Sequence, residues 1–600
     1  MKRKIIWLGL SLLLVVALVL SSCNKTTTSS STTTSMTTTT TTNAVTTTST
    51  TKTSTTTPVT TTSPTTPKYG GTITLITNWY SSTPDGFNSL SVRQWEASVW
   101  TNPFLEWLVR ADIEKYGPRG SNQYSFGTWE EVPDAYVGGE LAESWEISTS
   151  PLKITFNLRK GVMWTGNTNI GMAPREFVAD DVVYTILRVK NTPPQASYIT
   201  FIKTCYTTGK YTVVWELNNW DANWYFNVGG GMSMGAMVAK ESVTSADPAS
   251  YKNAVGTGPF ILTDYVTGSM ATYSRNQNYW GKTTIDGKEY QMPFIDKLYY
   301  PVVADESTAI AALRTGKVDW WPNVKLQYST TLTQTSPDLI QTKYLGGSVD
   351  ILRFNRLTSK YFTNKNLRQA LMIGTDLNTI AKLIYNGGEV YSWPLAPGVP
   401  GFTALDQLPA ADQQLFKYDT TLAKKMIADA GYPTGFSMEL DVDAAHTDLA
   451  NALVGMWSQI GVKATINIRD STTLASIRGG VTYKDCIYYT YPVVNPLTAL
   501  GSIRSTVVGA VYKPSEGFDA MYNTAQQTAD PVAQTAAVKA LAVAYLDDCG
   551  VLPFTNYYTL NCYWPWMKNY YGELEVGYHN EKSQLERIWV DQALKKSMGK

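Results

Sequence analysis

The sequence predicts a mixed α/β fold in two or more lobes. Helical patterns alternate with short strand patterns over two large segments, and this alternation is typical of α/β or α+β architectures. About 530 of the 600 residues follow a threonine- and serine-rich tract. That length exceeds what a single hydrophobic core usually holds, so we expect at least two lobes.

The elements of the first segment follow from residue periodicity. Ile154, Phe156 and Leu158 alternate along the second strand of a hairpin whose turn lies near Ser150 and Pro151. Apolar positions recur three and four apart in the next predicted helix. The full set comprises a strand in 69–77, a helix in 94–110 that Pro103 can break, the hairpin in 141–164, a helix in 174–190 and a strand pair in 256–281.

The second segment begins with a strand–helix–turn–strand pattern in residues 296–321. Residues 364–388 are predicted to be helical, and a further helix is predicted in 418–432. Gly431 is expected to end that last helix, because glycine accepts the left-handed backbone of a helix C-terminus.

The N-terminal residues have the order of an export signal, 1–22. Basic residues 2–4 precede the apolar run 5–20, and two serines then lead to Cys23. The run is short for a membrane-spanning helix, which needs about 20 residues, although an uncleaved membrane helix is the alternative. The L-S-S-C stretch resembles the lipobox of bacterial lipoproteins, which implies that Cys23 is lipidated. Either interpretation places the rest of the chain outside the cytoplasm.

Residues 24–67 contain little besides threonine and serine, with Pro58, Pro64 and Pro67. Such a tract has too few apolar residues to offset the entropy of ordering, so we expect a disordered tether. As a flexible coil it would reach roughly 35–40 Å on average. Residues 23–67 are therefore predicted to be a lipidated cysteine followed by a tether, and O-glycosylation of the tract is left open.

The overall charge is balanced, with 50 Lys and Arg against 49 Asp and Glu. Nothing in this balance indicates a nucleic-acid partner. Aromatic residues make up 12% of the chain, enough to fill a core and also to line a pocket. Only two histidines, His446 and His579, occur, and no CxxC pattern is present. These counts weaken the case for a histidine-rich metal site and for histidine-based acid/base chemistry. We expect no metal, no cofactor and no catalysis.

Four cysteines follow Cys23, and an exported chain permits disulfides between them. Their spacing fixes no pairing, although Cys549 and Cys562 are nearest in sequence. The remaining two are Cys205 and Cys486.

A series of stretches in a fixed order carries a family resemblance. The stretches are LAESWEI, ITFNLRKGVMWTG, FVADDVVYTILR, GTGPFIL, NYWG, ALRTGKVDW, LRFN, NKNLRQALMIGTDLNTIAKLIYNGGEVYSWPLAPGVPG, YDTTLAKKMIADAGYPTGF and LVGMWSQIGVKATI. Together they resemble family 5 of the bacterial extracellular solute-binding proteins, the oligopeptide-, dipeptide- and nickel-binding group. The resemblance covers residues 69 to about 571, with departures at 116–137 and 167–175.

The resemblance implies a two-lobed periplasmic-binding-protein-like fold with a hinge and an extra subdomain in the first lobe. It further implies that a small solute is buried between the lobes and delivered to an ABC permease, with ATP hydrolysis on a separate ATPase subunit. The boundaries expected for lobe 1 are 68–345 and 555–600, with the extra subdomain at about 110–250 and lobe 2 at 346–554.

The resemblance also implies a set of ligand-binding residues at the ends of segments that reach the cleft. They are Trp79, Tyr80, Trp320, Trp321, Asn355, Trp393, Tyr491 and Asn495. Ordinary packing in the core or on the surface is the alternative interpretation for each of them.

The cleft loop 491–496 departs from the family pattern. Many peptide-binding members place an aspartate there to pair with the peptide amino terminus, and this chain has no carboxylate in the loop. Asp85 or Glu389 could supply one from elsewhere. We expect a peptide as the first candidate solute and an oligosaccharide, stacked on tryptophan, as the second; other solutes, including metal chelates, come third.

Two other classes of function have some support in the sequence. Ser233 lies in a G-x-S-x-G pattern, which is the nucleophile elbow of α/β-hydrolases, but no clear strand precedes it. An adhesion or signalling module that kept the binding fold and lost its permease is the other alternative.

Overall fold

The computed structural model describes most of the chain from Thr66 onward. The described residues are 66–77, 86–88, 94–115, 119, 132, 134–193, 195–230, 235–492, 495–504, 517–574, 577 and 580–600. Every described residue lies within one compact unit, Ser63–Lys600. The predicted export signal, Cys23 and nearly all of the tether therefore lie outside the described residues. Within the described part, no helix combines the length and apolarity that crossing a membrane requires.

A four-stranded sheet forms the centre of what we call lobe 1, the elements before β16 and after β21. Its strand order is β1-β14-β11-β10, with β1 parallel to β14 and the other pairs antiparallel. The strands are β1 (Thr72–Thr74), β10 (Phe260–Val266), β11 (Met270–Arg275) and β14 (Lys297–Pro301). Apolar side chains from this sheet share one core with α2 (Gln94–Thr101), α5 (Glu306–Arg314) and the C-terminal residues around Trp564 and Trp566.

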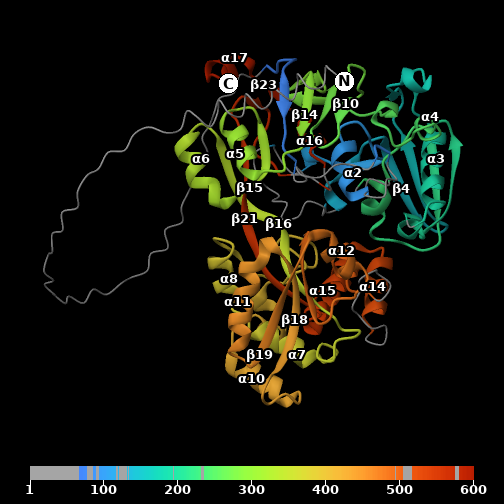
Figure 1. Ribbon diagram of the computed structural model, residues 1–600. Coiled ribbons are helices and arrows are strands. Elements are labelled where there is room, and N and C mark those ends of the chain that lie inside the picture. Colours follow the sequence, from blue (N-terminus) through green and yellow to red (C-terminus); the bar gives the residue numbers. More distant parts are fainter. Residues whose placement is uncertain are drawn as a thin grey trace, which may run out of the picture. The chain divides into compact units, whose positions relative to one another are not determined.

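The extra subdomain has its own sheet and its own core within lobe 1. The antiparallel sheet has the order β4-β5-β9-β8 and is covered by helix α3 (Figure 1). Its elements are β4 (Ala142–Thr149), β5 (Leu152–Leu158), β8 (Ile202–Gly209), β9 (Thr212–Leu217) and α3 (Ala179–Lys190). Its buried cluster runs from Leu108 to Val255 and includes Phe156 and Trp215.

A seven-stranded sheet continues from lobe 1 into lobe 2, the part made of the elements between β16 and β21. Its order is β15-β21-β16-β20-β18-β19, and β17 pairs with β21 off this path. The strands are β15 (Trp320–Lys325), β16 (Ile340–Phe354), β17 (Gly388–Glu389), β18 (Phe436–Asp443), β19 (Val462–Arg469), β20 (Cys486–Pro492) and β21 (Val551–Tyr563). The long strands β16 and β21 cross between the two lobes (Figure 1).

Helices cover both faces of the sheet in lobe 2. Successive side chains of a strand point to opposite faces, so Leu352 and Phe354 join one cluster while Val349 and Ile351 join the other. The helices are α7 (Lys365–Ile373), α8 (Leu377–Leu383), α9 (Ala410–Leu415), α10 (Thr420–Asp429), α11 (Thr447–Ser458), α12 (Ser471–Gly479), α13 (Pro496–Gly501), α14 (Phe518–Gln527) and α15 (Pro531–Asp548).

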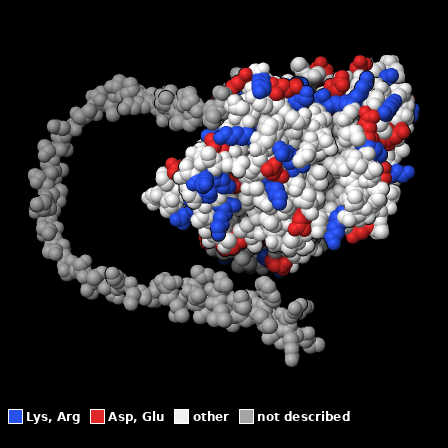
Figure 2. All heavy atoms as spheres, turned by 90° about the horizontal axis from the view of Figure 1, so that it is seen from above, with Lys and Arg blue, Asp and Glu red and all other residues white. Residues whose placement is uncertain are grey.

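Short elements complete the described part. They are β2 (Val109–Ala111), β3 (Val137–Gly139), β6 (Met163–Trp164), β7 (Arg175–Glu176), α4 (Lys240–Val243), β12 (Lys282–Ile285), β13 (Lys288–Gln291), α6 (Ser329–Thr335), β22 (Met567–Lys568), α16 (Lys582–Leu585), β23 (Trp589–Val590) and α17 (Gln592–Ser597). On the face seen in Figure 2, acidic and basic side chains are intermixed, as the balanced composition predicts.

Most of the predicted elements are present, and three need correction. The predicted helix 174–190 begins only at Ala179, and Arg175–Glu176 form the short strand β7. The predicted helix 94–110 ends at Thr101, because Pro103 lacks an N–H and disfavours helical geometry at the residue before it. The chain then extends into β2. The predicted helix 364–388 is two helices, α7 and α8, since Asp376 caps a new start by accepting from the N–H of Thr379. Gly431 has a φ of 96°, as expected of a helix stop.

No disulfide joins the four described cysteines. Cys205, Cys486, Cys549 and Cys562 are all buried and all free thiols. Cys549 and Cys562, the pair nearest in sequence, are therefore not bonded to each other, and the reason is their location in different cores. Cys549 packs in the lobe 2 cluster, whereas Cys562 packs in the lobe 1 cluster.

The boundaries predicted between the lobes stay predictions. The junction at 345 and 346 falls inside β16, and the junction at 554 and 555 falls inside β21. Both strands continue through these positions, so the sheet itself marks no break there.

Candidate binding site

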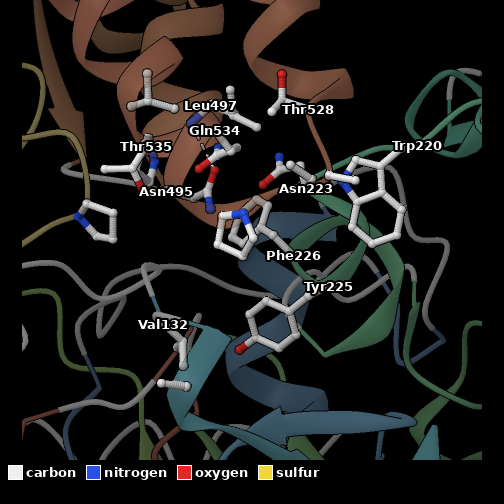
Figure 3. Close-up of a pocket in the computed structure, with 17 residues that line it drawn as sticks. Val132, Trp220, Asn223, Tyr225, Phe226, Asn495, Leu497, Thr528, Gln534 and Thr535 are labelled. Atoms are coloured by element: carbon white, nitrogen blue, oxygen red, sulfur yellow. Dashed lines mark hydrogen bonds between the residues drawn. The ribbon is translucent and has the colours of Figure 1, made fainter. Parts of the chain in front are cut away.

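A cavity of about 270 Å³ lies where the extra subdomain meets the helices of lobe 2. Figure 3 shows side chains from both parts around it. The lining residues are Val132, Ala135, Trp220, Ala222, Asn223, Tyr225, Phe226, Pro400, Asn495, Pro496, Leu497, Thr528, Ala529, Pro531, Gln534, Thr535 and Val538. Aliphatic residues and prolines make up about half of this lining, and aromatic rings and uncharged polar groups make up the rest. Such a mixture of apolar surface with a few polar groups is usual for a small-molecule site.

Most residues of the subdomain wall come directly after strand β9 in the sequence. The backbone N–H of Asn223 donates to Asp221 Oδ1 (2.8 Å), and the N–H of Asn227 donates to the carbonyl oxygen of Asn223 (2.9 Å). A π-helical turn, Tyr225–Gly229, then begins, and its first residues present two aromatic rings to the cavity. These local bonds hold Asn223 and the rings in place.

The lobe 2 wall consists of the starts of two helices. Asn495 caps α13, because its Oδ1 accepts from the N–H groups of Leu497 (3.1 Å) and Thr498 (3.3 Å). Asp530 caps α15 in the same way, by accepting from the N–H of Ala533 (2.8 Å). Proline at the first position of each helix fits the geometry of a helix start.

Hydrogen bonds join the two walls beside the cavity. The N–H of Ala222 donates to the carbonyl oxygen of Gln526 (2.7 Å), and Gln526 Nε2 donates to Asp221 Oδ2 (3.2 Å). Burial raises the pKa of Asp221 to about 6, against the effect of these bonds. The subdomain is therefore attached to helix α14 at this point.

A second polar group lies on the other face of the lobe 2 sheet, around Asp350. Its carboxylate accepts from the hydroxyls of Tyr385 (2.8 Å), Tyr488 (2.6 Å) and Thr490 (2.8 Å). His446 stacks on Tyr488, and its Nε2 lies 4.0 Å from Asp350 Oδ2. Burial, together with this carboxylate, raises the pKa of Tyr385 and Tyr488. The three donors satisfy Asp350 internally, so the group is structural in character.

The structure brings some of the predicted site residues together. Trp393 packs edge-on against Tyr491, with ring centroids 5.6 Å apart, in the lobe 2 cluster nearest the cavity. Asn495 lines the cavity itself. Trp79 and Tyr80 lie outside the described residues, as does Asp85. Glu389 accepts a hydrogen bond from Tyr558.

The other three predicted site residues are deeply buried, away from the cavity lining. Trp320 Nε1 donates to Asn561 Oδ1 (2.8 Å), and Trp321 is 1% exposed in the lobe 1 core. Asn355 Nδ2 donates to Thr358 Oγ1 (2.8 Å) and to the carbonyl oxygen of Tyr483 (2.6 Å). Each of the three contributes to packing or to a hydrogen-bonded turn.

Sequence reasoning missed Trp220 and Asn223, which line the cavity from the subdomain. They follow a strand in a part of the chain where no motif stands out. The tract NNWDANWYF is dense in aromatic and amide side chains, and that density is the signal that could have identified it.

Chemistry beyond binding finds little support in the described residues. No cluster of three or more His, Cys, Asp and Glu suited to a metal ion occurs among them. Ser233 lies outside the described residues, and His446 bonds to Asp443 rather than to a nucleophile.

Comparison with known proteins decides the family. The model of the family described as "Bacterial extracellular solute-binding proteins, family 5 Middle" matches residues 137–491, more than half of the chain. The chain belongs to this family. Members of the family and the similar solved structures are binding proteins rather than enzymes, and the comparisons give no support to a hydrolase or an adhesion module.

Curated relatives align with part of this family member. Heme-binding protein A of Haemophilus influenzae is 30% identical over 352 residues, which are 54% of this chain and 60% of that protein. The dipeptide-binding protein of Escherichia coli is 28% identical over 371 residues, 57% of this chain and 64% of that protein. The chain thus spans about three fifths of the length of these relatives.

Solved structures match nearly the whole folded part. The periplasmic binding protein DppA from Helicobacter pylori, in complex with peptide STSA, superposes with a TM-score of 0.68 at 21% identity, covering 87% of this chain and 99% of that chain. AppA from Bacillus subtilis, in complex with a nonapeptide, has a TM-score of 0.66 at 19% identity, covering 88% and 100%. The likeness confirms the predicted two-lobed periplasmic-binding-protein fold of mixed α/β type.

Proposed function

We propose that this family member is the extracytoplasmic receptor of an ABC importer. It captures a small solute between its two lobes and delivers it to a membrane permease, whose ATPase subunits drive uptake. Family membership over residues 137–491 is the observation that carries this proposal.

A peptide is the first candidate solute. Relatives named for dipeptides, and similar structures that hold peptides, support this choice. An oligosaccharide is the second candidate, because the cleft loop lacks a carboxylate and the described lining of the cavity is uncharged and includes Trp220, Tyr225 and Phe226. Heme, which the name of one relative mentions, belongs in the same test panel.

The proposed ligand contacts are those that the family resemblance implies. Asn495 has the most direct support, since it lines the cavity. Trp393 and Tyr491 pack in the neighbouring cluster. Trp79, Tyr80, Trp320, Trp321 and Asn355 stay proposals that depend on the resemblance.

A thermal-shift screen tests the proposal directly. Residues 63–600, the compact unit, would be heated with di- to pentapeptides, oligosaccharides, nickel chelates and heme. A ligand at one hundred times its Kd stabilises the folded form by about 2.7 kcal/mol, which is a readily measured shift in Tm. A shift with one class identifies the solute. Unchanged Tm values across all four classes would contradict the proposed peptide or oligosaccharide receptor.

A further inference from the structure

Two buried polar atoms on the subdomain wall of the cavity have no hydrogen-bond partner among the described residues. They are Asn223 Oδ1, an acceptor, and the indole Nε1 of Trp220, a donor. Asn223 is 5% exposed, and both side chains line the cavity (Figure 3). The amide of Asn223 is oriented by its nitrogen, which donates to Thr498 Oγ1 at 3.5 Å.

An unsatisfied buried polar group is unusual in a folded protein. More than nine in ten such groups have a partner, and leaving one without costs roughly 1–3 kcal/mol. A solute group that donates to Asn223 Oδ1 and accepts from Trp220 Nε1 would satisfy both atoms at once. The pair therefore specifies an occupant with a donor and an acceptor.

The rest of the lining specifies that the occupant is uncharged. The described lining residues include no Asp, Glu, Lys, Arg or His. Burying an ionised group without a counter-charge is far more costly than burying a neutral one. Thr528, Gln534 and Thr535 add neutral polar groups on the opposite wall, and Tyr225 and Phe226 add flat apolar faces.

We propose that this cavity is a subsite for an uncharged group that carries both a hydrogen-bond donor and an acceptor, namely an amide or a hydroxyl of the solute. The inference rests on the proposed receptor function and deepens it. A volume of about 270 Å³ is slightly below that of a typical small-molecule pocket, so the cavity holds one side chain or one sugar residue. A peptide amide and a sugar hydroxyl are the two sources of this chemistry.

Matched probes test the charge preference. Calorimetric titration of residues 63–600 would use tripeptides of alanine with one glutamine at each of the three positions, the same peptides with glutamate or lysine, and maltotriose. We expect one glutamine peptide, or maltotriose, to bind at least about tenfold tighter than every charged peptide. Which of the two binds tells whether the neutral group comes from a peptide or a sugar. Equal binding of glutamine and charged peptides would overturn the proposal.

Variants of Trp220 and Asn223 test whether these two residues cause the preference for neutral probes. Asn223→Leu and Trp220→Phe each remove one hydrogen bond, so we expect a roughly five- to tenfold loss with the preferred neutral probe. Asn223→Asp introduces a carboxylate and should move the preference toward the lysine peptide. The exposed Leu383→Ala is the control and should bind as wild type. Folding of each variant is checked by its Tm, and Trp220→Phe, which keeps an aromatic ring but removes the indole N–H, serves if Asn223→Leu does not fold.

The outcomes separate this inference from the receptor function. If peptides or maltotriose bind but without charge preference, or if the variants keep the preference, the subsite proposal is wrong and the receptor proposal stands. If wild type binds none of these probes, the subsite proposal is wrong as well, and the screen with heme and chelates decides the receptor proposal separately.

Discussion

Single residues differ in whether their buried polar atoms have hydrogen-bond partners. This difference distinguishes a residue that stabilises the fold from a candidate ligand-binding residue. Asp350 is 3% exposed, yet three hydroxyls donate to it. Asn223 is equally buried, but its Oδ1 has no partner among the described residues. The first pattern stabilises the fold, whereas the second, at a cavity wall, is the basis of the proposed subsite.

Removing the Asp350 carboxylate should destabilise lobe 2 strongly. In Asp350→Ala the hydroxyls of Tyr385, Tyr488 and Thr490 lose their acceptor, and we expect a loss of about 3 kcal/mol or more in the free energy of unfolding. Urea denaturation measures it. Asp350→Asn, which keeps one acceptor oxygen, should lose less, and the exposed Asp338→Ala should change little. A loss under 1 kcal/mol in Asp350→Ala would contradict this account.

Glu106 should make stability depend on pH. It is fully buried and accepts from Tyr279 (3.2 Å) and from Trp280 (3.1 Å). Burial, reinforced by the charge of Glu140, raises the pKa of Glu106 from 4.5 to about 7. Between these values the folded state keeps a proton that the unfolded chain has released. The contribution of Glu106 to stability therefore falls as the pH rises from 4.5 to 7.

Denaturation of Glu106→Gln at pH 5 and pH 8 tests this sign. Glutamine stays neutral at both pH values. The free energy of unfolding of the variant, relative to that of wild type, should therefore increase by on the order of 3 kcal/mol between pH 5 and pH 8. Glu143→Gln, at an exposed position, is the control and should follow wild type. A difference between wild type and Glu106→Gln that does not change with pH would show that Glu106 titrates normally.

At the scale of elements, helix α7 is attached to the end of α15 by two ion pairs of very different burial. Arg368 is 1% exposed and donates to Asp548 Oδ1 (2.9 Å) and to two backbone carbonyls there. Lys365, on the same helix, bonds to the neighbouring Asp547 (2.8 Å), but both side chains are more than 40% exposed. The two pairs therefore allow the stability contributions of a buried and an exposed ion pair to be compared within one helix contact.

Breaking the buried pair should cost much more than breaking the exposed one. Arg368→Met leaves the Asp548 charge with one fewer partner in a dry site, so we expect a loss of about 3–5 kcal/mol. Lys365→Met should cost under about 1 kcal/mol, because the exposed pair is screened by water. Urea denaturation of both variants measures the contrast, and similar losses would show that burial is not the deciding factor.

The elements themselves were largely predictable from the sequence, because strand alternation and helix capping are local. The hairpin of β4 and β5 and the start of α10 follow from neighbouring residues alone. The division of the predicted helix 364–388 was missed because a cap at Asp376 overrides favourable helix propensity on both sides. The separation of Cys549 from Cys562 depends on which core each residue enters, and sequence distance does not report that.

The candidate site was predictable only in part. Asn495 was reached through the family loop, and it lines the cavity. Trp220 and Asn223 were missed, because their importance depends on packing against α13 to α15, far away in the chain. That an acceptor lacks a partner is a property of the assembled structure, and no pattern within residues 220–226 records it.

At the scale of the whole molecule, two strands connect the lobes, and hydrogen bonds beside the cavity reinforce this connection. β16 and β21 run side by side from one lobe to the other, and their pairing register shifts between Leu345 and Val349. Ala222, which donates to Gln526, and Asp221, which accepts from Gln526, join the lobes beside the cavity. An irregular ladder bends more easily than a regular one, so we expect lobe motion to be concentrated at this shift.

The proposed role also requires that the folded unit be held near a permease, and Cys23 is the residue proposed to do this. Acyl chains on one cysteine give stable anchoring, because each buried methylene contributes roughly 0.8 kcal/mol. Cys23→Ser should therefore move the protein from the membrane fraction to the soluble fraction or block its maturation, and it should abolish labelling by radioactive palmitate. The Tm of the folded protein should not depend on Cys23, since the hydrophobic clusters of the described residues lie within residues 63–600. Wild-type protein that takes up no palmitate, together with a variant that stays in the membrane fraction, would instead indicate that the apolar run 5–20 is an uncleaved membrane helix.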